Sequence, residues 1–345
     1  MSAFRTLFLL VATACCVANP VQASSLQAPL TLSDAGSFFV GGRNYRSDHA
    51  DARGGKPVQG MVRTGQMYVQ FRIPSAINGP PVVMVHGANH TGVTFETTPD
   101  GREGWATYFT RRGLPVYVID QAGRGRSGFD PSSINKATLQ GQATDMPSIA
   151  IATRENAWMS YRLGPKVGEF WSDSRFPKEA LDQYFSQNTP MAETTLPGAG
   201  ENTIAGLVAL LERIGPAILL VHSQGGAYGL AVARARPDLV QAIVNVEGDC
   251  VPMSEADIAK SFGRIPLISV WGDHSVGFPS RNGDMRRNGC ADSVRAIQAK
   301  GGPATFLLLP EVGVKGNSHM MMLETNNLQI ADLILDWIKT HGAAR

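Results

Sequence analysis

Short apolar segments alternate with helical segments over most of this chain, and that alternation limits its fold more than any other feature of the sequence. Apolar, β-rich runs lie at residues 82–85, 116–119, 217–221, 242–246, 267–270 and 305–309. Stretches with a helical pattern lie at residues 105–112, 224–236, 291–300 and 328–340. Strands that are apolar along their whole length belong to sheets covered on both faces. The sequence therefore predicts the α/β class, with a mostly parallel, twisted sheet and helices on both faces.

Two regions depart from this alternation. Ser37–Gly42 and Met61–Ile73 are predicted to be antiparallel strands, the second with a turn at Thr64-Gly65. From Asp130 to Pro197 no strand pattern is found, and the segment is rich in aromatic side chains. It is too long for an ordinary loop and too aromatic for a disordered linker. We expect a helical cap, inserted at about residues 130–200 over the edge where the parallel strands end.

The first 23 residues have the three parts of an export signal in order. Arg5 precedes an apolar stretch at 6–18 that is too short to cross a bilayer, and Val21-Gln22-Ala23 matches the small-residue cleavage pattern. We expect residues 1–23 to be removed and residues 24–345 to form one exported domain, periplasmic or secreted. Because the later apolar runs are shorter than a membrane helix, no membrane span is predicted.

The cysteines and the charge balance narrow the surroundings of the mature chain. Cys250 and Cys290 are the two cysteines left after cleavage. In an oxidising compartment we expect them to pair, with two buried thiols as the alternative. The chain has 31 basic and 29 acidic residues without runs of one sign, which favours neither nucleic acid nor an anionic membrane as a partner. The oligomeric state stays open, with a homodimer as one option.

The apolar run Ala217–Val221 leads directly into His222-Ser223-Gln224-Gly225, and a helical pattern follows at once. A strand, a serine and a helix in direct succession form a nucleophile elbow, a sharp turn that exposes the serine oxygen above a sheet. Val221 stands where the usual G-x-S-x-G pattern has its first glycine, so the motif is incomplete. We predict that Ser223 is a nucleophile; a serine that only caps the helix is the alternative.

A serine nucleophile needs a base, and the base needs an orienting acid. His319 lies between the last predicted strand and the last predicted helix, where this fold places the base. His274 comes one strand earlier, and His341 lies in the C-terminal tail. Two carboxylates, Glu247 and Asp273, each follow a predicted strand in a suitable position. Position alone does not decide between these two acids.

The apolar run at 82–85 is followed by His86-Gly87-Ala88-Asn89. A His-Gly pair after this strand is typical of the loop that supplies one backbone N–H to an oxyanion hole, while the residue after the serine supplies the other. We therefore predict the amides of Ala88 and Gln224 as the oxyanion donors, and His86 as a residue that orders the loop.

Four blocks of sequence together resemble a small family of bacterial esterases within the α/β-hydrolase superfamily. They are Thr94–Gly101, Tyr117–Gln121, Gly123–Ser127 and Gly316–Met322. The resemblance extends from about Gly36 to Ile338 and implies the α/β-hydrolase fold for this whole stretch.

This resemblance also bears on individual residues. It implies that Glu247 is the acid, with Asp273 as a secondary site residue, and it supports the pairing of Cys250 with Cys290. The family's founding member has a disulfide between adjacent cysteines beside the oxyanion hole. Here Ala88-Asn89 occupies those positions, so no such disulfide can form.

We therefore expect an exported serine hydrolase that cleaves small-molecule carboxylic esters through an acyl-enzyme, with no cofactor and no metal. An amidase or lactonase could use the same residues, and a non-catalytic binding protein of this fold is a further alternative. The stretch Gly123–Gly128 resembles a dinucleotide-binding loop, but two arginines fill it and no ribose-binding acid follows a next strand. The sequence contains no H-E-x-x-H motif or close cysteine–histidine cluster that would indicate zinc.

Overall fold

The computed structural model of this 345-residue protein describes residues 28–192, 199–278 and 282–342. The export signal predicted at residues 1–23 lies outside these ranges. Within them, the structure contains no helix that is both long enough and apolar enough to cross a membrane.

Eight strands of the described chain form one sheet in the spatial order β1-β2-β4-β3-β5-β6-β7-β8. The β1–β2 and β2–β4 pairs are antiparallel and all other pairs are parallel, which confirms the predicted mostly parallel sheet. All residues of β3, β5 and β7 are buried, as strands covered on both faces require. The strands are β1 (Leu32–Asp51), β2 (Val58–Pro74), β3 (Val82–Val85), β4 (Val116–Asp120), β5 (Ala217–His222), β6 (Val240–Val246), β7 (Leu267–Trp271) and β8 (Ala304–Leu308).

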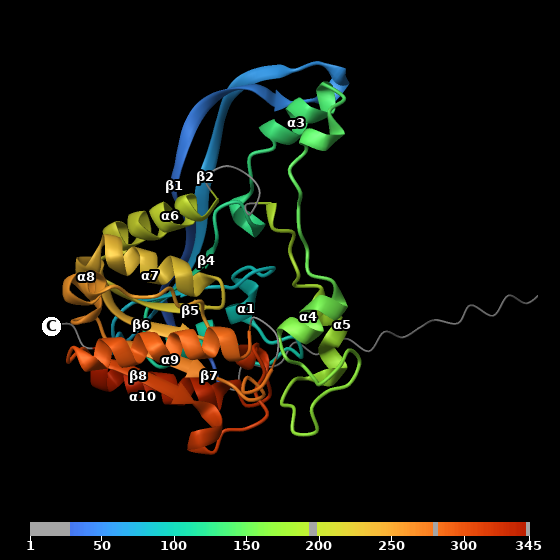
Figure 1. The fold of residues 1–345 in the computed structure, drawn as a ribbon. Coiled ribbons are helices and arrows are strands. Elements are labelled where there is room, and N and C mark those ends of the chain that lie inside the picture. The colour runs from blue at the N-terminus through green and yellow to red at the C-terminus, as the bar shows by residue number, and fades with distance from the viewer. Residues whose placement is uncertain (1–27, 193–198, 279–281, 343–345) are drawn as a thin grey trace, which may run out of the picture.

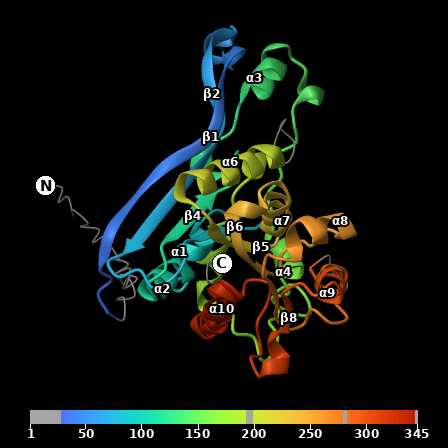
Figure 2. The ribbon, with the colours of Figure 1, turned by 90° about the vertical axis from the view of Figure 1, so that its left-hand side faces the viewer.

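The α-helices in the described ranges are α1 (Val93–Glu96), α2 (Trp105–Arg111), α3 (Ser132–Leu139), α4 (Arg154–Ser160), α5 (Leu181–Phe185), α6 (Ala199–Ile214), α7 (Gly225–Ala235), α8 (Glu255–Asp257), α9 (Asp284–Ala299) and α10 (Asn327–His341). The longer helices of the main body cover both faces of the sheet (Figures 1 and 2). α2 and α10 pack with strand residues such as Met84 and Leu220 on one face, and α6, α7 and α9 pack with Val85 and Leu219 on the other. Successive strand residues point to opposite faces, so each strand supplies both cores.

The short helices α1 and α8 are not predicted, and two of the long helices also differ from the sequence prediction. α6 is not predicted, although Leu207, Leu210 and Leu211 form a buried apolar stripe at helical spacing. α9 is predicted only from Ala291, but it begins at Asp284. The first turns of α9 carry a buried arginine, Arg286, where an apolar residue would have completed the periodic pattern.

The antiparallel strands β1 and β2, called the ribbon below, extend far beyond the rest of the sheet (Figure 1). The predicted turn at Thr64-Gly65 is wrong, because β2 runs through both residues and pairs with β1 on either side of them. Gly42 and Gly65 instead adopt positive φ angles, a conformation that suits glycine. A Cβ at Gly65 would lie 2.9 Å from the side chain of Asn202, so glycine also lets the ribbon approach α6.

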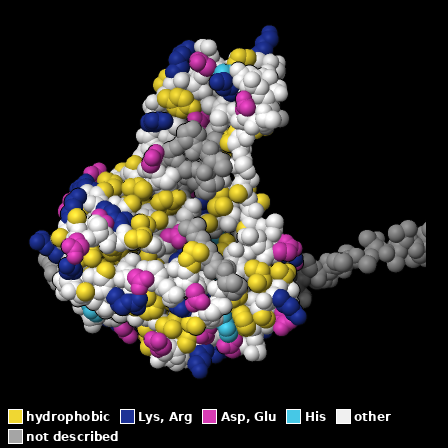
Figure 3. All heavy atoms as spheres, viewed as in Figure 1, with side chains coloured by type: hydrophobic (Ala, Val, Ile, Leu, Met, Phe, Trp, Pro, Cys, Tyr) yellow, Lys and Arg dark blue, Asp and Glu magenta, His cyan; other side chains and the backbone are white. Residues whose placement is uncertain are grey.

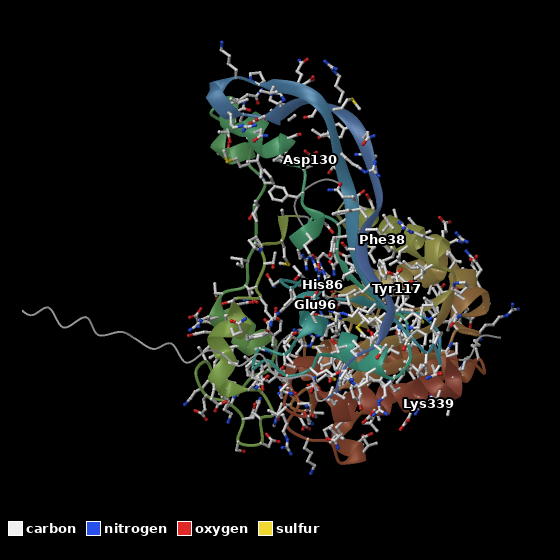
Figure 4. The ribbon with its side chains drawn as sticks, turned by 180° about the vertical axis from the view of Figure 1, so that it is seen from behind. Phe38, His86, Glu96, Tyr117, Asp130 and Lys339 are labelled. Atoms are coloured by element: carbon white, nitrogen blue, oxygen red, sulfur yellow. A yellow bond between two sulfur atoms is a disulfide. The ribbon has the colours of Figure 1, made fainter. Side chains whose placement is uncertain are left out.

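Residues 130–200 contain α3, α4 and α5, and their two ends lie in different places. α3 packs on the far end of the ribbon, where Tyr45 donates a hydrogen bond to Asp130 and Ser47 bonds Ser132 at 2.7 Å. Figure 4 shows Asp130 at this end and His86 inside the main body. α4 and α5 lie beside the main body (Figure 1), and residues next to α4 reach the predicted active-site residues, as described below.

The surface and the cysteines agree with the sequence-based expectations. Basic and acidic side chains are mixed over the face seen in Figure 3, without a large area of one sign. Cys250 and Cys290 form a disulfide bond, which confirms their predicted pairing. This bond joins the loop after β6 to α9.

Candidate active site

Ser223 stands at a sharp turn between β5 and α7. Its φ angle is 53°, a conformation that few residues other than glycine adopt. The turn is held on both sides, because the backbone N–H of Ser223 donates to Val246 O at 3.3 Å and Ser223 O accepts from Asp249 N at 2.8 Å. A strained serine between a buried strand and a helix is the geometry of a nucleophile elbow.

Glycines around this turn allow the elements to approach closely. A Cβ at Gly87 would lie 2.7 Å from the Cβ of Ser223, and one at Gly225 would lie 2.9 Å from Val85 O. On the other side of the elbow, a Cβ at Gly229 would lie 2.7 Å from a methyl group of Val221. The space that the usual motif gains from a glycine at position 221 is thus provided here by Gly229 on α7.

His319 follows β8 and connects the serine to a carboxylate. Its Nε2 lies 3.0 Å from Ser223 Oγ, and its Nδ1 lies 2.6 Å from Glu247 Oε2. With the Nδ1 proton directed to the carboxylate, Nε2 can accept the proton of the serine hydroxyl. Ser223, His319 and Glu247 therefore form one continuous chain of hydrogen bonds.

Glu247 follows β6 and is fully buried. Arg162 donates two hydrogen bonds to its carboxylate, at 2.8 and 2.5 Å, and Gly272 N donates a third at 2.8 Å. Burial alone raises the pKa of the Glu247 carboxyl, but the charge of Arg162 and the hydrogen bond with His319 outweigh it and lower that pKa to about 2. Glu247 is therefore ionised over the working range of most enzymes.

The imidazole of His319 is neutral near pH 7. Burial lowers its pKa most, and together with the charges of Arg286 and Arg162 it outweighs the opposing effect of Glu247 and brings the pKa to about 4. A neutral imidazole is the form that can accept a proton.

The backbone of His319 is held from two sides. Its N–H donates to Tyr161 O at 3.0 Å, and its carbonyl lies 3.0 Å from His222 Nε2. The ring of Tyr161 also stacks on the His319 ring, with 5.6 Å between centroids. Because Tyr161 and Arg162 are adjacent, one short stretch after α4 fixes both the histidine and the glutamate.

Asp273, the other candidate acid, is placed differently. Its carboxylate accepts a hydrogen bond from Gly316 N, and its backbone N–H donates to Asn317 O at 2.7 Å. It therefore supports the loop that carries His319, and Glu247 is the carboxylate that contacts the imidazole.

Asp273 also belongs to a group of described residues whose donor atoms lie within 4.8 Å of one another, together with Asp173 and His274. A metal ion could use such a group, but the Asp273 carboxylate already accepts from Gly316 N, and the other two members bond each other. His274 Nε2 lies 3.0 Å from the Asp173 carboxylate, and the His274 ring stacks on Trp171. We assign this group a structural role that joins residues 171–173 to the loop after β7.

The loop after β3 brings Ala88 close to the serine elbow. His86 is buried, and its ring accepts a hydrogen bond from Gln121 N at 3.0 Å, so it orders the loop. Arg124 donates to Gly87 O at 2.8 Å and to the Gln224 side chain at 3.1 Å, which joins the two segments that carry the predicted oxyanion donors.

Asn89, in the position of a family cysteine, has a φ angle of 59°. Its side chain accepts from Ala152 N at 2.9 Å, and its carbonyl accepts from Thr189 N at 2.8 Å. Backbone groups of residues 130–200 thus hold the loop that lacks the adjacent-cysteine disulfide.

Arg286 also reaches the serine. Its Nη1 lies 3.0 Å from Ser223 Oγ, and its Nε lies 2.7 Å from an oxygen of Asp249. Arg286, Arg162 and Tyr161 are not predicted as site residues from the sequence. No motif marks them, because they lie far along the chain from the residues they contact.

These elements define the class of protein. An eight-stranded, mostly parallel sheet with a serine elbow after β5 and a histidine after β8 is the α/β-hydrolase fold.

Two known proteins are similar to this chain over most of its length. The probable secreted lipase phiG from Fungal sp. (strain ATCC 74256) is 30% identical over 341 residues, covering 82% of this chain and 88% of that protein. The solved structure "The Atomic Resolution Structure of a Novel Bacterial Esterase" has a TM-score of 0.86 and 41% identity, covering 92% of this chain and 98% of the other. No family model matches the sequence. The chain belongs to the family of α/β-hydrolases that contains this lipase and this bacterial esterase.

Proposed function

We propose that this protein is an exported serine hydrolase that cleaves carboxylic esters through an acyl-enzyme. The observation that carries the proposal is the continuous hydrogen-bond chain from Ser223 Oγ through His319 to Glu247. The names of the two relatives, a lipase and an esterase, support ester substrates. The secreted relative and the disulfide support export.

In the first half of the reaction, Ser223 Oγ attacks the ester carbonyl carbon and transfers its proton to His319 Nε2. The new C–O bond produces a tetrahedral oxyanion, which the amides of Ala88 and Gln224 stabilise. As the bond to the alcohol breaks, His319 returns its proton to the leaving oxygen. Glu247 keeps the imidazole oriented and stabilises its charged form throughout.

In the second half, a water molecule replaces the alcohol. His319 takes a proton from this water, which attacks the acyl carbon and forms a second tetrahedral oxyanion. The bond to Ser223 Oγ then breaks, the serine recovers its proton from His319, and the carboxylic acid leaves. The cycle consumes one ester and one water and uses no cofactor.

The test compares wild type with Ser223→Ala on p-nitrophenyl butyrate. We expect kcat to fall by roughly 10⁴-fold or more, because no other group replaces the nucleophile. A serine-directed phosphonate should label the wild type only, as measured by intact mass. Ser293→Ala is the matched control, because Ser293 is a buried serine on α9 whose hydroxyl bonds Gly289 O. An unlabelled and inactive wild type would instead favour a non-catalytic binding protein.

A further inference from the structure

Arg286 is a buried cation at the reacting atom. The residue is 9% exposed, and its guanidinium lies beside Ser223 Oγ. Taking a guanidinium out of water is costly unless its N–H groups find acceptors. An arginine at this position is therefore expected to have a role that a smaller, apolar residue could not fill.

The structure fixes the direction in which Arg286 presents its N–H groups. Asp249 binds the Nε edge at 2.7 Å, which directs Nη1 toward the nucleophile. Cys290 lies four residues further along α9 and therefore on the same face of the helix. The disulfide to Cys250 ties this face to the loop that also carries Asp249. The guanidinium is thus held in place before substrate arrives.

The hydrogen-bond roles at Ser223 change during the proposed reaction. In the free enzyme the hydroxyl donates to neutral His319, so a lone pair of Oγ accepts from Arg286. In the acyl-enzyme the same oxygen is the single-bonded oxygen of an ester, which is a weaker acceptor than a hydroxyl. Nη1 also contacts Glu247 O, at a longer distance of 3.4 Å. Acylation therefore weakens the hydrogen bond between Arg286 and this oxygen, so that a charged acceptor on the substrate can compete for the guanidinium.

We propose that Arg286 binds a carboxylate on the acyl part of the substrate, so that the preferred substrates are half-esters of short dicarboxylic acids. The guanidinium fork matches a carboxylate in shape and charge. Because Arg286 is in contact with the atom that becomes acylated, only a short chain between the scissile carbonyl and the carboxylate can reach it. This inference rests on the proposed function and adds the substrate class to it.

Two esters of nearly equal shape test the proposal. Monoethyl succinate carries a carboxylate where ethyl levulinate carries a neutral methyl ketone, and both release ethanol. For wild type we expect kcat/KM to be about ten- to a hundredfold higher for monoethyl succinate at pH 8, the size typical of hydrogen bonds between charged groups. A wild-type preference below about twofold would overturn the proposal, whether or not any variant folds.

Variants then assign the preference to this side chain. Arg286→Gln should reduce the ratio of the two kcat/KM values to about one, and Arg286→Lys should keep part of it. Arg295→Gln is the control, because Arg295 is an exposed arginine on the same helix, paired with Asp292, and should leave the ratio unchanged. If Arg286→Gln slows both esters equally, the residue does not recognise a carboxylate. If neither ester is cleaved and the phosphonate labels nothing, the proposed function itself fails, and this inference fails with it.

Discussion

The parallel part of the sheet, from β3 to β8, and the antiparallel ribbon differ in almost every respect. The strands β3 to β7 are four to seven residues long and mostly buried, and β8 is half-buried at the edge of the sheet. In contrast, β1 and β2 have 20 and 17 residues; β1 is exposed over about half of its length and β2 is mostly half-buried. Ser223, Glu247 and His319 all follow parallel strands, and the ends of such strands meet at one edge of a sheet. The short parallel strands position the side chains of the candidate active site, whereas the long ribbon supports α3.

If the parallel part alone carries the chemistry, its two candidate acids should behave very differently. Glu247→Gln should lower kcat by roughly 10³–10⁴-fold, because the imidazole loses its orienting charge. Asp273→Asn should stay within about tenfold, because its carboxylate bonds the backbone N–H of Gly316. Steady-state kinetics on p-nitrophenyl butyrate measure both. A larger loss in Asp273→Asn than in Glu247→Gln would reverse the assignment of the acid.

Arg162 tests whether residues 130–200 contribute to the chemistry as well as to the fold. Arg162→Gln leaves Glu247 buried without its cation, and we expect the protein to be destabilised by about 3–5 kcal/mol. In the wild type, the charge of Arg162 helps to lower the pKa of His319 to about 4. Because the base must be neutral, activity falls as pH drops through that pKa, and in the variant this fall should begin at a higher pH.

The pH profile of kcat/KM, together with denaturant unfolding, separates the two effects of Arg162. Arg162→Lys, which keeps a positive charge, should return the acid limb toward its wild-type position. A reduced rate with an unmoved acid limb would show that Arg162 acts by packing alone.

Removing the disulfide tests how much of the stability of the parallel part comes from this covalent bond. Replacing Cys250 and Cys290 by serine removes a bridge across a sequence separation of 40 residues, which corresponds to about 4 kcal/mol of stability in the chain-entropy model. Urea unfolding of oxidised and variant protein measures this difference. Equal midpoints for the two proteins would mean that the bridge does not constrain the unfolded chain.

The ribbon should give the smallest effect. Tyr45→Phe removes the hydroxyl that bonds Asp130 and lies 3.0 Å from Ser132 at the far end of the ribbon. We expect a loss of about 1 kcal/mol in unfolding free energy and a kcat/KM within about twofold of wild type. A tenfold loss of activity at unchanged stability would contradict the division between ribbon and parallel part.

The sequence predicted the parallel part well because local patterns encode it. Buried strands such as Val82–Val85 are continuous apolar runs, and the residues that follow them carry the chemistry. The ribbon was predicted less well because its long, exposed or half-buried strands lack a continuous apolar run, and their glycines adopt positive φ angles without ending the strands. In a sequence, a glycine such as Gly65 is typical of a turn. Here glycine is needed because α6 packs closely against this position, and that contact cannot be predicted from the neighbouring residues.

The residues of the candidate site also fall into those that local sequence patterns predict and those that they do not. Ser223 and His319 stand at positions that chain order alone indicates, and Glu247 needed the family resemblance. Arg162 and Arg286 could not be predicted, because a buried charge is stabilised by a partner distant in sequence. Nothing near either arginine distinguishes it from the many that lie on the surface.

The contact between Val221 and Gly229 has a consequence for how such enzymes are found and compared. Close packing of β5 against α7 requires a small residue at this contact, and that residue can lie on either β5 or α7. Substitutions at the two positions should therefore compensate: Gly229→Ala alone should clash with Val221, and adding Val221→Gly should relieve the clash. A chain that fails a strict nucleophile-elbow pattern can satisfy its steric requirement with a glycine about one turn into the following helix.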